Sequence, residues 1–413
     1  MKKILFITHE YYPFGSAITN CLNPIIKQMQ EQDIEVFVLT RKSTKNLKDY
    51  EIIDNVKVLR VPDHYLLLLE KRESIYKNSK SKIKKLIVRI YFHLVWLQKK
   101  FSIEDGYFTK NKTIKYGKKL LKKENIDTII SCSFPFTSHK IGSKLKKRNN
   151  IWIAYQFDPY TYNYTLMTDG KTKKRLKIEL KYLKQADSVF ITIENYNENM
   201  KTELKKLDYK YVVLPYALIK KTAIVKKPQN KEINLTFTGT LYEHLREPYK
   251  MLEILNKFDY KINIYYASEE PIIIGLKKYQ ELLGSKLKLF FKKSKLECDK
   301  ALVKTNIIIN IGNTMINQTP SKVFELISLG KPIINFYTNA LDTSKEILKD
   351  YPICYNIDVN NFNDYNDLKQ FCEKNKNTVL PFEEATKKYL KSEEVALELI
   401  KEVEKIENRQ NKK

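Results

Sequence analysis

Cysteine is scarce in this chain of 413 residues, and no two cysteines lie close together. The five cysteines are Cys21, Cys132, Cys298, Cys354 and Cys372. None of them forms the CxxC spacing of a zinc or redox site, and their odd number and wide separation argue against a disulfide framework. The pattern is typical of a protein in a reducing compartment, so we expect a cytoplasmic location.

Glycine is scarce as well, and the sequence motifs that depend on it are missing. None of the ten glycines has the GxGxxG spacing that an NAD or FAD site requires, and there is no Walker A loop. The chain also has no Asp-x-Asp pair, the usual means by which nucleotide-sugar enzymes hold a divalent metal. We therefore predict neither a metal nor a cofactor, and any bound diphosphate must be neutralised by Arg, Lys and helix termini.

Long hydrophobic runs are absent too. No stretch approaches the 18 apolar residues of a membrane span, and the opening KKILFIT predicts a strand instead of the apolar region of a signal peptide. We expect a protein that neither spans a membrane nor is exported.

Acidic residues are outnumbered by basic ones. The chain has 75 Lys and Arg against 48 Asp and Glu, a net charge of +27, which indicates an anionic partner. From Lys71 to Lys123 there are 17 Lys or Arg and 3 acids, a balance of +14 in 53 residues. More than half of the net charge therefore lies in one segment.

That basic segment contains an amphipathic pattern over residues 83–97. At 100° per residue, Lys85, Arg89 and His93 lie on one face and Trp96 and Phe92 flank it. The other face carries Ile83, Leu86, Ile87, Ile90, Tyr91, Leu94 and Leu97. The pattern predicts a helix that either lies on an anionic membrane surface, as a peripheral protein would, or packs on the amino-terminal sheet.

Short β-branched runs alternate with amphipathic, lysine-rich segments along the chain. This alternation predicts an α/β fold with doubly wound parallel sheets. The expected strands span residues 4–8, 34–40, 56–61, 126–131, 151–155 and 188–193, then 234–240, 261–266, 287–291, 306–311 and 332–337. We predict an amino-terminal domain at 1–215, a linker at 216–232, a second domain at 233–385, and a helix at 386–413 that crosses back to the first domain.

The second half carries groups suited to a phosphorylated ligand. In FTGTLYEHLREP, Gly239 lies at a strand end where backbone can approach a ligand, and Arg246 follows near the next helix. Arg246 could bind a diphosphate bidentately, although an arginine at a helix start can equally be a solvated surface cation.

A second motif, NQTPSKVFELISLGKPIINFY, begins at Asn317. Thr319 and Pro320 predict the start of a helix that runs to Leu329, and Gly330 ends it.

Three residues of this predicted helix share one face. Ser321 and Lys322 lie four and three residues before Glu325, so the face could bind phosphate at the helix start and a ribose at Glu325. The alternative is a simple ion pair between Glu325 and a neighbouring lysine.

The first half offers weaker candidates. Gly15 and Ser16 follow the first strand and could form a backbone-amide pocket, and His9 is a candidate for the acceptor site. His139 could be either catalytic or structural, and Asp158 could bind substrate or only cap a turn.

The motif SKVFELISLGKPII resembles the donor-site motif of the GT-B fold glycosyltransferases, family 4 in particular, in which Glu-x7-Glu is followed by GKPV. The second Glu of that motif matches Glu325, whereas the first corresponds to Asn317, as in a bacterial surface-polysaccharide subgroup that also resembles the chain at GTLYEHLREP. SFPFTSHKIG and AYQFDPY are similar to the family's amino-terminal domain at His139 and Asp158.

The resemblance implies two Rossmann-like domains that face each other across a cleft, with the donor on the second domain. It implies transfer of a sugar from a nucleoside diphosphate sugar to a lipid-linked or saccharide acceptor, with retention and without metal, in the synthesis of a surface polysaccharide such as a capsule. Arg246, Lys322 and His139 would be catalytic, and Asn317 would contact the donor sugar.

Two other functions remain open at this point. A nucleotide-sugar epimerase could use the same fold and donor site, but it would turn over its donor without an acceptor. A nucleic-acid-binding protein would explain the net charge, although the chain lacks zinc-finger, RNP and helix-turn-helix patterns.

Overall fold

The computed structural model describes residues 2–13, 17–101, 107–158, 160–162, 170–192, 211–221, 228, 230, 232–314 and 320–411. The chain divides into two compact units. Unit 1 comprises Met1–Ala217 and Glu393–Lys413, and unit 2 comprises Leu218–Ser392. The division after Ala217 lies inside the range predicted as a linker.

Unit 1 is built on an eight-stranded sheet in the order β3-β4-β2-β1-β5-β6-β7-β8. Every pairing is parallel except that of β3 with β4. The strands are β1 (Lys3–Ile7), β2 (Glu35–Lys42), β3 (Tyr50–Ile53), β4 (Val56–Pro62), β5 (Thr128–Ser133), β6 (Ile151–Gln156), β7 (Ser188–Thr192) and β8 (Tyr211–Leu214). The six strands predicted for this half are confirmed, whereas β3 and β8 were missed because each is short and largely not buried.

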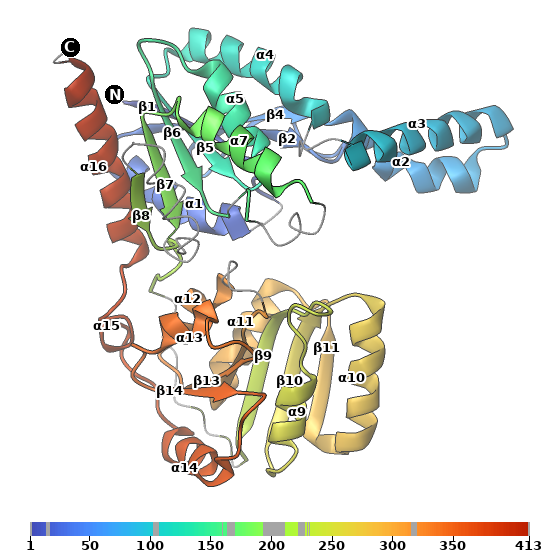
Figure 1. Cartoon of the computed structure of the whole chain (residues 1–413), viewed down its shortest axis with the longest axis vertical. Helices are drawn as coiled ribbons and strands as arrows, with labels where there is room; N and C mark the ends of the chain where they lie inside the picture. The colour runs from blue at the N-terminus through green and yellow to red at the C-terminus, as the bar shows by residue number, and fades with distance from the viewer. Residues whose placement is uncertain are drawn as a thin grey trace. The chain divides into compact units, whose positions relative to one another are not determined.

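The helices of unit 1 include two that form a hairpin at its side (Figure 1). The hairpin consists of α2 (His64–Asn78) and α3 (Lys82–Phe101). The others are α1 (Ala17–Gln30), α4 (Tyr107–Glu124), α5 (Thr137–Leu145), α7 (Thr172–Leu183) and the carboxyl-terminal α16 (Ser392–Asn411). No helix in the described part of the chain is long and apolar enough to cross a membrane.

Helix α16 belongs to unit 1 although it follows unit 2 in the sequence. Glu407 lies 2.9 Å from the ammonium of Lys2, and Glu402 accepts a hydrogen bond from Ser188 in β7. These contacts tie the carboxyl end of the chain to the amino-terminal sheet.

Unit 2 contains a six-stranded parallel sheet in the order β11-β10-β9-β12-β13-β14. Its strands are β9 (Asn234–Thr240), β10 (Lys261–Ala267), β11 (Leu287–Phe291), β12 (Ile307–Ile311), β13 (Ile333–Tyr337) and β14 (Cys354–Asp358). Its helices are α9 (Tyr249–Leu255), α10 (Glu270–Leu283), α11 (Lys295–Lys304), α12 (Lys322–Ile327), α13 (Thr343–Leu348), α14 (Tyr365–Asn375) and α15 (Phe382–Ala385). The five predicted strands are confirmed, and β14 was missed because most of its residues are only half-buried.

The strand order of unit 2 reverses direction between β9 and β12. Such a reversal leaves a crevice at the carboxyl ends of the two strands, where ligands bind in open α/β sheets. All five residues of β12 are buried, as expected for a central parallel strand covered on both faces. The switch point between β9 and β12 therefore marks where a site should be sought.

Candidate functional site

The loops that follow β9 and β12 are tied together at the switch point of unit 2. Thr314, three residues after β12, donates its backbone N–H to the carbonyl of Leu245 at 2.9 Å. Its hydroxyl donates to the carbonyl of His244 at 2.7 Å. The loop that carries Arg246 is thus held against the end of β12.

Arg246 is fixed by a buried amide. Its Nε and Nη2 donate to the side-chain oxygen of Asn313 at 3.0 and 2.7 Å, and its Nη1 donates to the carbonyl of Thr240 at 3.1 Å. Burial lowers the pKa of Arg246, while Tyr242 and Asp342 oppose that shift, so the guanidinium stays charged. Arg246 is therefore a positioned cation and not a freely solvated one.

Glu325 lies in a cluster of charged side chains from α11 and α12. Its Oε2 is 2.5 Å from the ammonium of Lys322 and 3.1 Å from that of Lys295. Asp299 lies 3.4 Å from Lys295 and 3.8 Å from Lys322.

Two opposing effects set the ionisation of Glu325. Burial disfavours the charge, but Lys322 and Lys295 outweigh it, so the pKa of Glu325 lies below its ordinary value. Its side chain keeps 22% of its surface exposed. Glu325 is thus an ionised, accessible carboxylate, and both of its described ion pairs end on Oε2 alone.

The predicted bounds of the helix around Glu325 were wrong. Helix α12 begins at Lys322 and ends at Ile327, and Ser321 is its N-cap without a side-chain capping bond. The backbone at Pro320 and beyond Ile327 makes tighter i to i+3 hydrogen bonds, which lie outside the α-helix. Gly330, with φ of 66°, ends the segment as predicted. With six residues the helix has little dipole, so charge for an anion must come from side chains.

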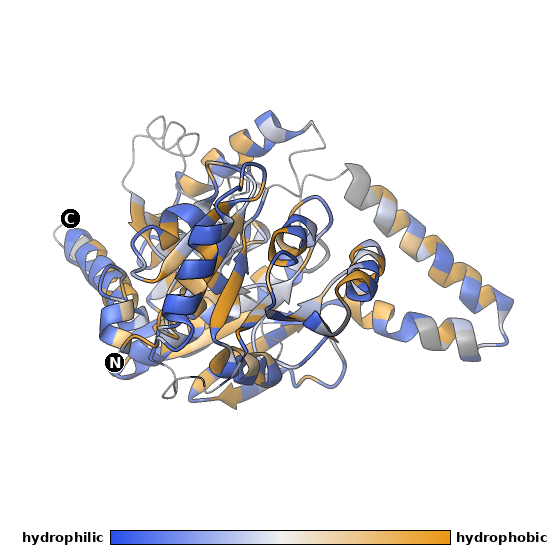
Figure 2. Ribbon diagram, turned by 90° about the horizontal axis from the view of Figure 1, so that it is seen from below, coloured by the Kyte–Doolittle hydropathy of each residue, from blue (hydrophilic) through white to orange (hydrophobic). Residues whose placement is uncertain are grey.

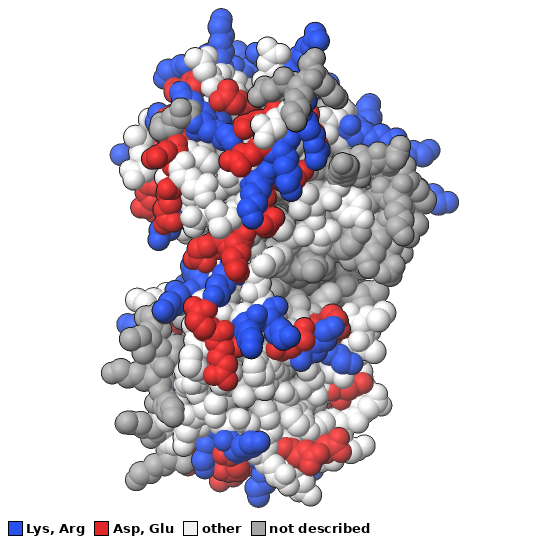
Figure 3. Space-filling model, turned by 90° about the vertical axis from the view of Figure 1, so that its left-hand side faces the viewer, with Lys and Arg blue, Asp and Glu red and all other residues white. Residues whose placement is uncertain are grey.

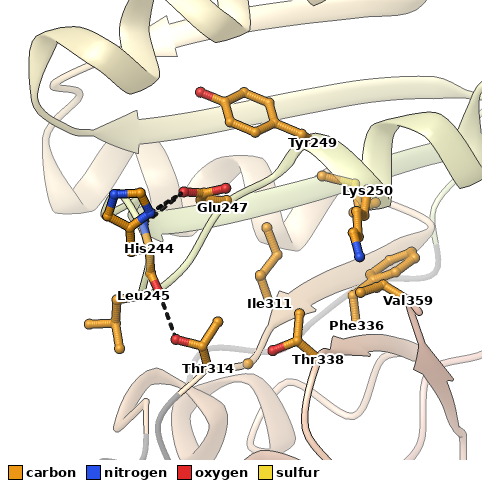
Figure 4. A pocket seen from close by; sticks show the side chains of 12 residues that line it. His244, Leu245, Glu247, Tyr249, Lys250, Ile311, Thr314, Phe336, Thr338 and Val359 are labelled. Carbon is orange, nitrogen blue, oxygen red and sulfur yellow. Dashed lines mark hydrogen bonds and ion pairs between the residues drawn. The ribbon is translucent and has the colours of Figure 1, made fainter.

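A cavity of about 230 Å³ opens beside the loop of Arg246 (Figure 4). Its walls are the carboxyl ends of β12, β13 and β14 and the start of α9, with the sequence neighbours of Arg246 among them. His244 and Glu247 pair at its rim, with 3.7 Å between Nδ1 and Oε1. Pockets for whole small molecules span roughly 300–1,000 Å³, so this one could hold only part of a nucleotide sugar.

Gly239, the other residue predicted in this loop region, lies within β9. A Cβ at this position would come 3.1 Å from the ring of Phe237. The glycine therefore also leaves room for a neighbouring aromatic side chain.

The carboxyl edge of the unit 1 sheet carries two titratable groups whose pKa values are shifted by burial. His9 follows β1, and burial together with the nearby Arg41 lowers its pKa to about 3. Arg41 itself pairs with Glu10 at 2.5 Å. Asp158 follows β6, and burial raises its pKa to about 6. These groups come from β1, β2 and β6 and lie at one edge of the same sheet.

His139 lies inside unit 1 and has no exposed surface. Its Nδ1 is 2.8 Å from the hydroxyl oxygen of Ser131, which also accepts a hydrogen bond from the Trp152 indole at 2.9 Å. Burial lowers the pKa of His139 to about 3, so the ring is neutral. This environment is typical of a structural histidine, so we assign His139 no part in the chemistry.

Some predicted residues lie outside the described part of the chain, namely Gly15, Ser16 and Asn317. Within it, Lys322 and Glu325 are brought into contact with each other, and Arg246 is bound to Asn313, which precedes the undescribed residues 315–319. Asn313 and Lys295 were missed by the sequence reasoning. Asn313 could have been found as a polar residue directly after a buried strand, whereas Lys295 carries no such signal.

Comparisons with known proteins find the same fold in solved structures of low sequence identity. No protein-family model and no curated protein matches the sequence. Among solved structures, sucrose-phosphate synthase from Thermosynechococcus elongatus is similar at a TM-score of 0.65 and 12% identity, covering 99% of this chain and 100% of that one. The catalytic domain of starch synthase IV from Arabidopsis thaliana, bound to ADP and acarbose, is similar at a TM-score of 0.58 and 9% identity. The match covers 100% of both chains.

A third similar structure is HepE of Anabaena in complex with UDP-glucose. It matches at a TM-score of 0.59 and 9% identity, over 98% of this chain and 100% of that one. These likenesses extend over the whole chain and agree with the two parallel sheets described above. The chain therefore has the two-unit, Rossmann-like GT-B fold.

Proposed function

We propose that this chain is a glycosyltransferase that moves a sugar from a nucleoside diphosphate sugar to an acceptor. The observation that carries the proposal is the pair of fixed groups around the switch point of unit 2. Arg246 is locked onto Asn313 in the loop after β9, and Glu325 is an ionised, accessible carboxylate on the helix after β12. A cation for a diphosphate and a carboxylate for a ribose diol are the groups that a nucleoside diphosphate needs.

In this proposal the cations act on the leaving group. Negative charge develops on the diphosphate as the bond to the sugar breaks, so Arg246 and Lys322 stabilise the transition state more than the bound donor. Glu325 accepts hydrogen bonds from the ribose hydroxyls, and Ser321 and Asn317 contact the donor nearby. Lys322 must share its charge between Glu325 and the phosphate.

The finer features of the proposal come from the family resemblance. Transfer proceeds with retention by a front-face reaction, which needs no nucleophile from the enzyme. It proceeds without a metal, because the cations neutralise the diphosphate. The acceptor is a lipid-linked or soluble saccharide in the synthesis of a cell-surface polysaccharide, and the enzyme works at the inner face of the cell membrane. His9 and Asp158 are candidates for the acceptor side.

Two of the similar structures support the choice of donor. HepE of Anabaena was solved with UDP-glucose, and the starch synthase domain was solved with ADP and acarbose. Both have the fold of this chain and bind nucleoside diphosphates, which is the ligand class that the switch-point residues suit.

Calorimetry with UDP, GDP, ADP and CMP, and with duplex DNA as a competing ligand, tests the proposal. We expect one nucleoside diphosphate to bind more tightly than CMP, and the binding to be lost in Glu325→Ala. Binding of DNA alone, with no affinity for any nucleotide, would contradict it.

A turnover assay with the preferred nucleotide sugar separates transfer from epimerisation. Donor consumption that requires a saccharide or lipid-linked acceptor supports transfer, whereas interconversion of the donor without an acceptor supports an epimerase. Activity should survive EDTA. If chelation abolishes turnover and magnesium or manganese restores it, the metal-free mechanism is wrong.

A further inference from the structure

Helix α3 carries an apolar face that stays exposed among the residues that the structure describes. Five large side chains on this helix, spaced for one face, are between 50% and 71% exposed, namely Ile83, Leu86, Ile87, Ile90 and Leu94. We call these five residues the α3 stripe. Soluble proteins rarely leave such contiguous apolar patches open unless something binds there.

The opposite side of α3 packs on α2. The ring of Phe92 lies 5.7 Å from that of Tyr65, and the Arg72 guanidinium lies 4.9 Å from the Phe92 ring. Val88 is 6% exposed. The alternative that α3 packs on the amino-terminal sheet is therefore wrong, because α2 is its described partner and the hairpin projects from the side of unit 1 (Figures 1 and 2).

Basic side chains border the α3 stripe. Lys80, Lys82, Lys84 and Arg89 are all exposed, and no acidic residue occurs between Glu73 and Glu104. On the side of the molecule drawn in Figure 3, by contrast, acidic side chains lie among the basic ones. An apolar stripe with exposed cations along its borders complements a membrane surface, whose interior is apolar and whose headgroups are anionic.

Trp96 does not belong to the α3 stripe. It is 53% exposed and follows Phe92 by four residues, so it lies on the side of α3 that faces α2. Its ring stacks on that of His93 with 5.7 Å between the ring centres. The docking surface therefore consists of the α3 stripe and the basic side chains at its borders.

We propose that the α2–α3 hairpin is a membrane-docking element that lays the α3 stripe into the headgroup boundary of an anionic bilayer. Helix α3 has 20 residues and is about 30 Å long, so it offers several turns of apolar surface parallel to the membrane. A second copy of the chain is a poorer occupant, because pairing two stripes would bring two basic segments together without counter-charge.

The inference does not depend on the sugar chemistry, because docking can be measured without donor or acceptor. The protein should pellet with vesicles that contain phosphatidylglycerol at low salt, pellet less at high salt, and pellet poorly with phosphatidylcholine alone. Failure of the proposed function would leave this result unchanged.

A double substitution tests the apolar part. Ile90→Gln with Leu94→Gln should weaken vesicle binding about tenfold or more for each side chain, while glutamine preserves helix propensity. The matched control is Ile274→Gln with Leu282→Gln on α10, whose side chains are 50% and 71% exposed. The control should bind vesicles like the wild type.

A charge-reversal set tests the electrostatic part. Lys82, Lys84 and Arg89 changed to Glu should weaken binding about fivefold or more per residue. The control, Lys257, Lys277 and Lys278 changed to Glu, makes the same change in net charge on exposed residues of unit 2. Equal losses in both sets would mean that only net charge matters and would overturn the hairpin assignment.

A tryptophan in the α3 stripe supplies an optical probe. Of the chain's two tryptophans, Trp152 is fully buried and Trp96 lies on the side of α3 away from the stripe. With Leu94→Trp on a Trp96→Phe background, emission should shift to shorter wavelength on adding anionic vesicles and become protected from acrylamide, whereas Trp96→Phe alone should show neither change. This readout detects docking even if the double glutamine variant fails to fold.

Three results would overturn the proposal. The first is a wild type that ignores anionic vesicles at low salt. The second is vesicle binding that leaves the tryptophan of the Leu94→Trp variant unprotected from acrylamide. The third is a concentration-dependent dimer that the glutamine pair abolishes, with no vesicle binding, because the α3 stripe would then be a contact between copies.

Discussion

Unit 1 and unit 2 share a parallel-sheet plan, yet the carboxyl ends of their strands differ in electrostatic character. In unit 2, Arg246 and Glu325 are charged and held by hydrogen bonds or ion pairs. In unit 1, His9 and Asp158 have pKa values of about 3 and about 6, shifted by burial toward the neutral form. Two sheets of the same plan thus differ in what burial does at their strand ends, because the charges in unit 2 are held by fixed partners, whereas burial shifts the pKa values of the two groups in unit 1.

This contrast agrees with the division of labour in the proposed reaction. A nucleoside diphosphate carries charge that must be met by fixed charges, whereas a sugar acceptor presents hydroxyls that a neutral histidine or a carboxylate can bind.

Replacing Arg246 should have the largest effect on catalysis. Arg246→Ala should lower turnover about a hundredfold or more, with a smaller loss of donor affinity, because the lost charge acts on the leaving group. Arg246→Lys should recover only part of the rate, since lysine cannot make the paired contact with Asn313. Steady-state kinetics measure both, with the exposed Lys277→Ala as control. Wild-type turnover in Arg246→Ala would contradict the assignment.

Replacing Glu325 should act on binding. Glu325→Ala removes charge-assisted hydrogen bonds worth about 1.5–3 kcal/mol each, so nucleotide affinity should fall at least tenfold in calorimetry. Asp299→Ala is the matched control, because Asp299 pairs with the same lysines but has no proposed contact with ribose. If both variants lose equal affinity, the carboxylates only balance charge and Glu325 does not hold the ribose.

Asn313 should act as a positioning residue for Arg246. Asn313→Ala removes two hydrogen bonds to a charged group, so we expect kcat to fall about tenfold with little change in KM. Asn313→Asp keeps an acceptor for the guanidinium and should bind it more strongly, which reduces the charge available to the phosphate. If Asn313→Ala loses thermal stability but keeps a normal kcat, then Asn313 has only a structural role.

In unit 1, the pH dependence of the free energy of unfolding tests the pKa shift of Asp158. Burial raises the pKa of Asp158 to about 6, so the folded state holds its proton more tightly than the unfolded state. The contribution of Asp158 to stability therefore falls as pH rises from about 4 to about 6, by up to about 3 kcal/mol. Asp158→Asn should remove this dependence.

Asp158→Asn and the wild type must be compared at each pH, because His9 and His139 change the stability in the opposite direction. Their pKa values of about 3 mean that the unfolded state takes up protons first, so their contribution is lost as pH falls below about 6.5. The difference in melting temperature between Asp158→Asn and wild type isolates the carboxyl group. A difference that stays constant from about pH 4 to about pH 7 would mean that Asp158 titrates normally.

The elements of the fold could be predicted because their signals are local. The apolar runs ILFI and IIINI alternate with lysine-rich segments, and side-chain burial at each strand follows directly from that composition. The strands β3 and β14 lack such runs, and β8, although it reads YVVL, is only four residues long and lies directly before a proline, so none of the three was predicted. The charged residues of the site, Arg246 and Glu325, were also visible because both occur in short motifs.

Eleven of the fourteen described strands, the amphipathic helix and the charge around it could be read from the sequence, because each depends on neighbours within a few residues. That Asn313 holds Arg246, 67 residues away, and that Lys295 shares Glu325 with Lys322, came from the structure alone. It also decided that His139 is sealed in the core, and that α2 packs on α3 opposite the α3 stripe. The physical reason is that these contacts join residues far apart along the chain, and no local pattern specifies which distant side chain will lie within hydrogen-bonding distance.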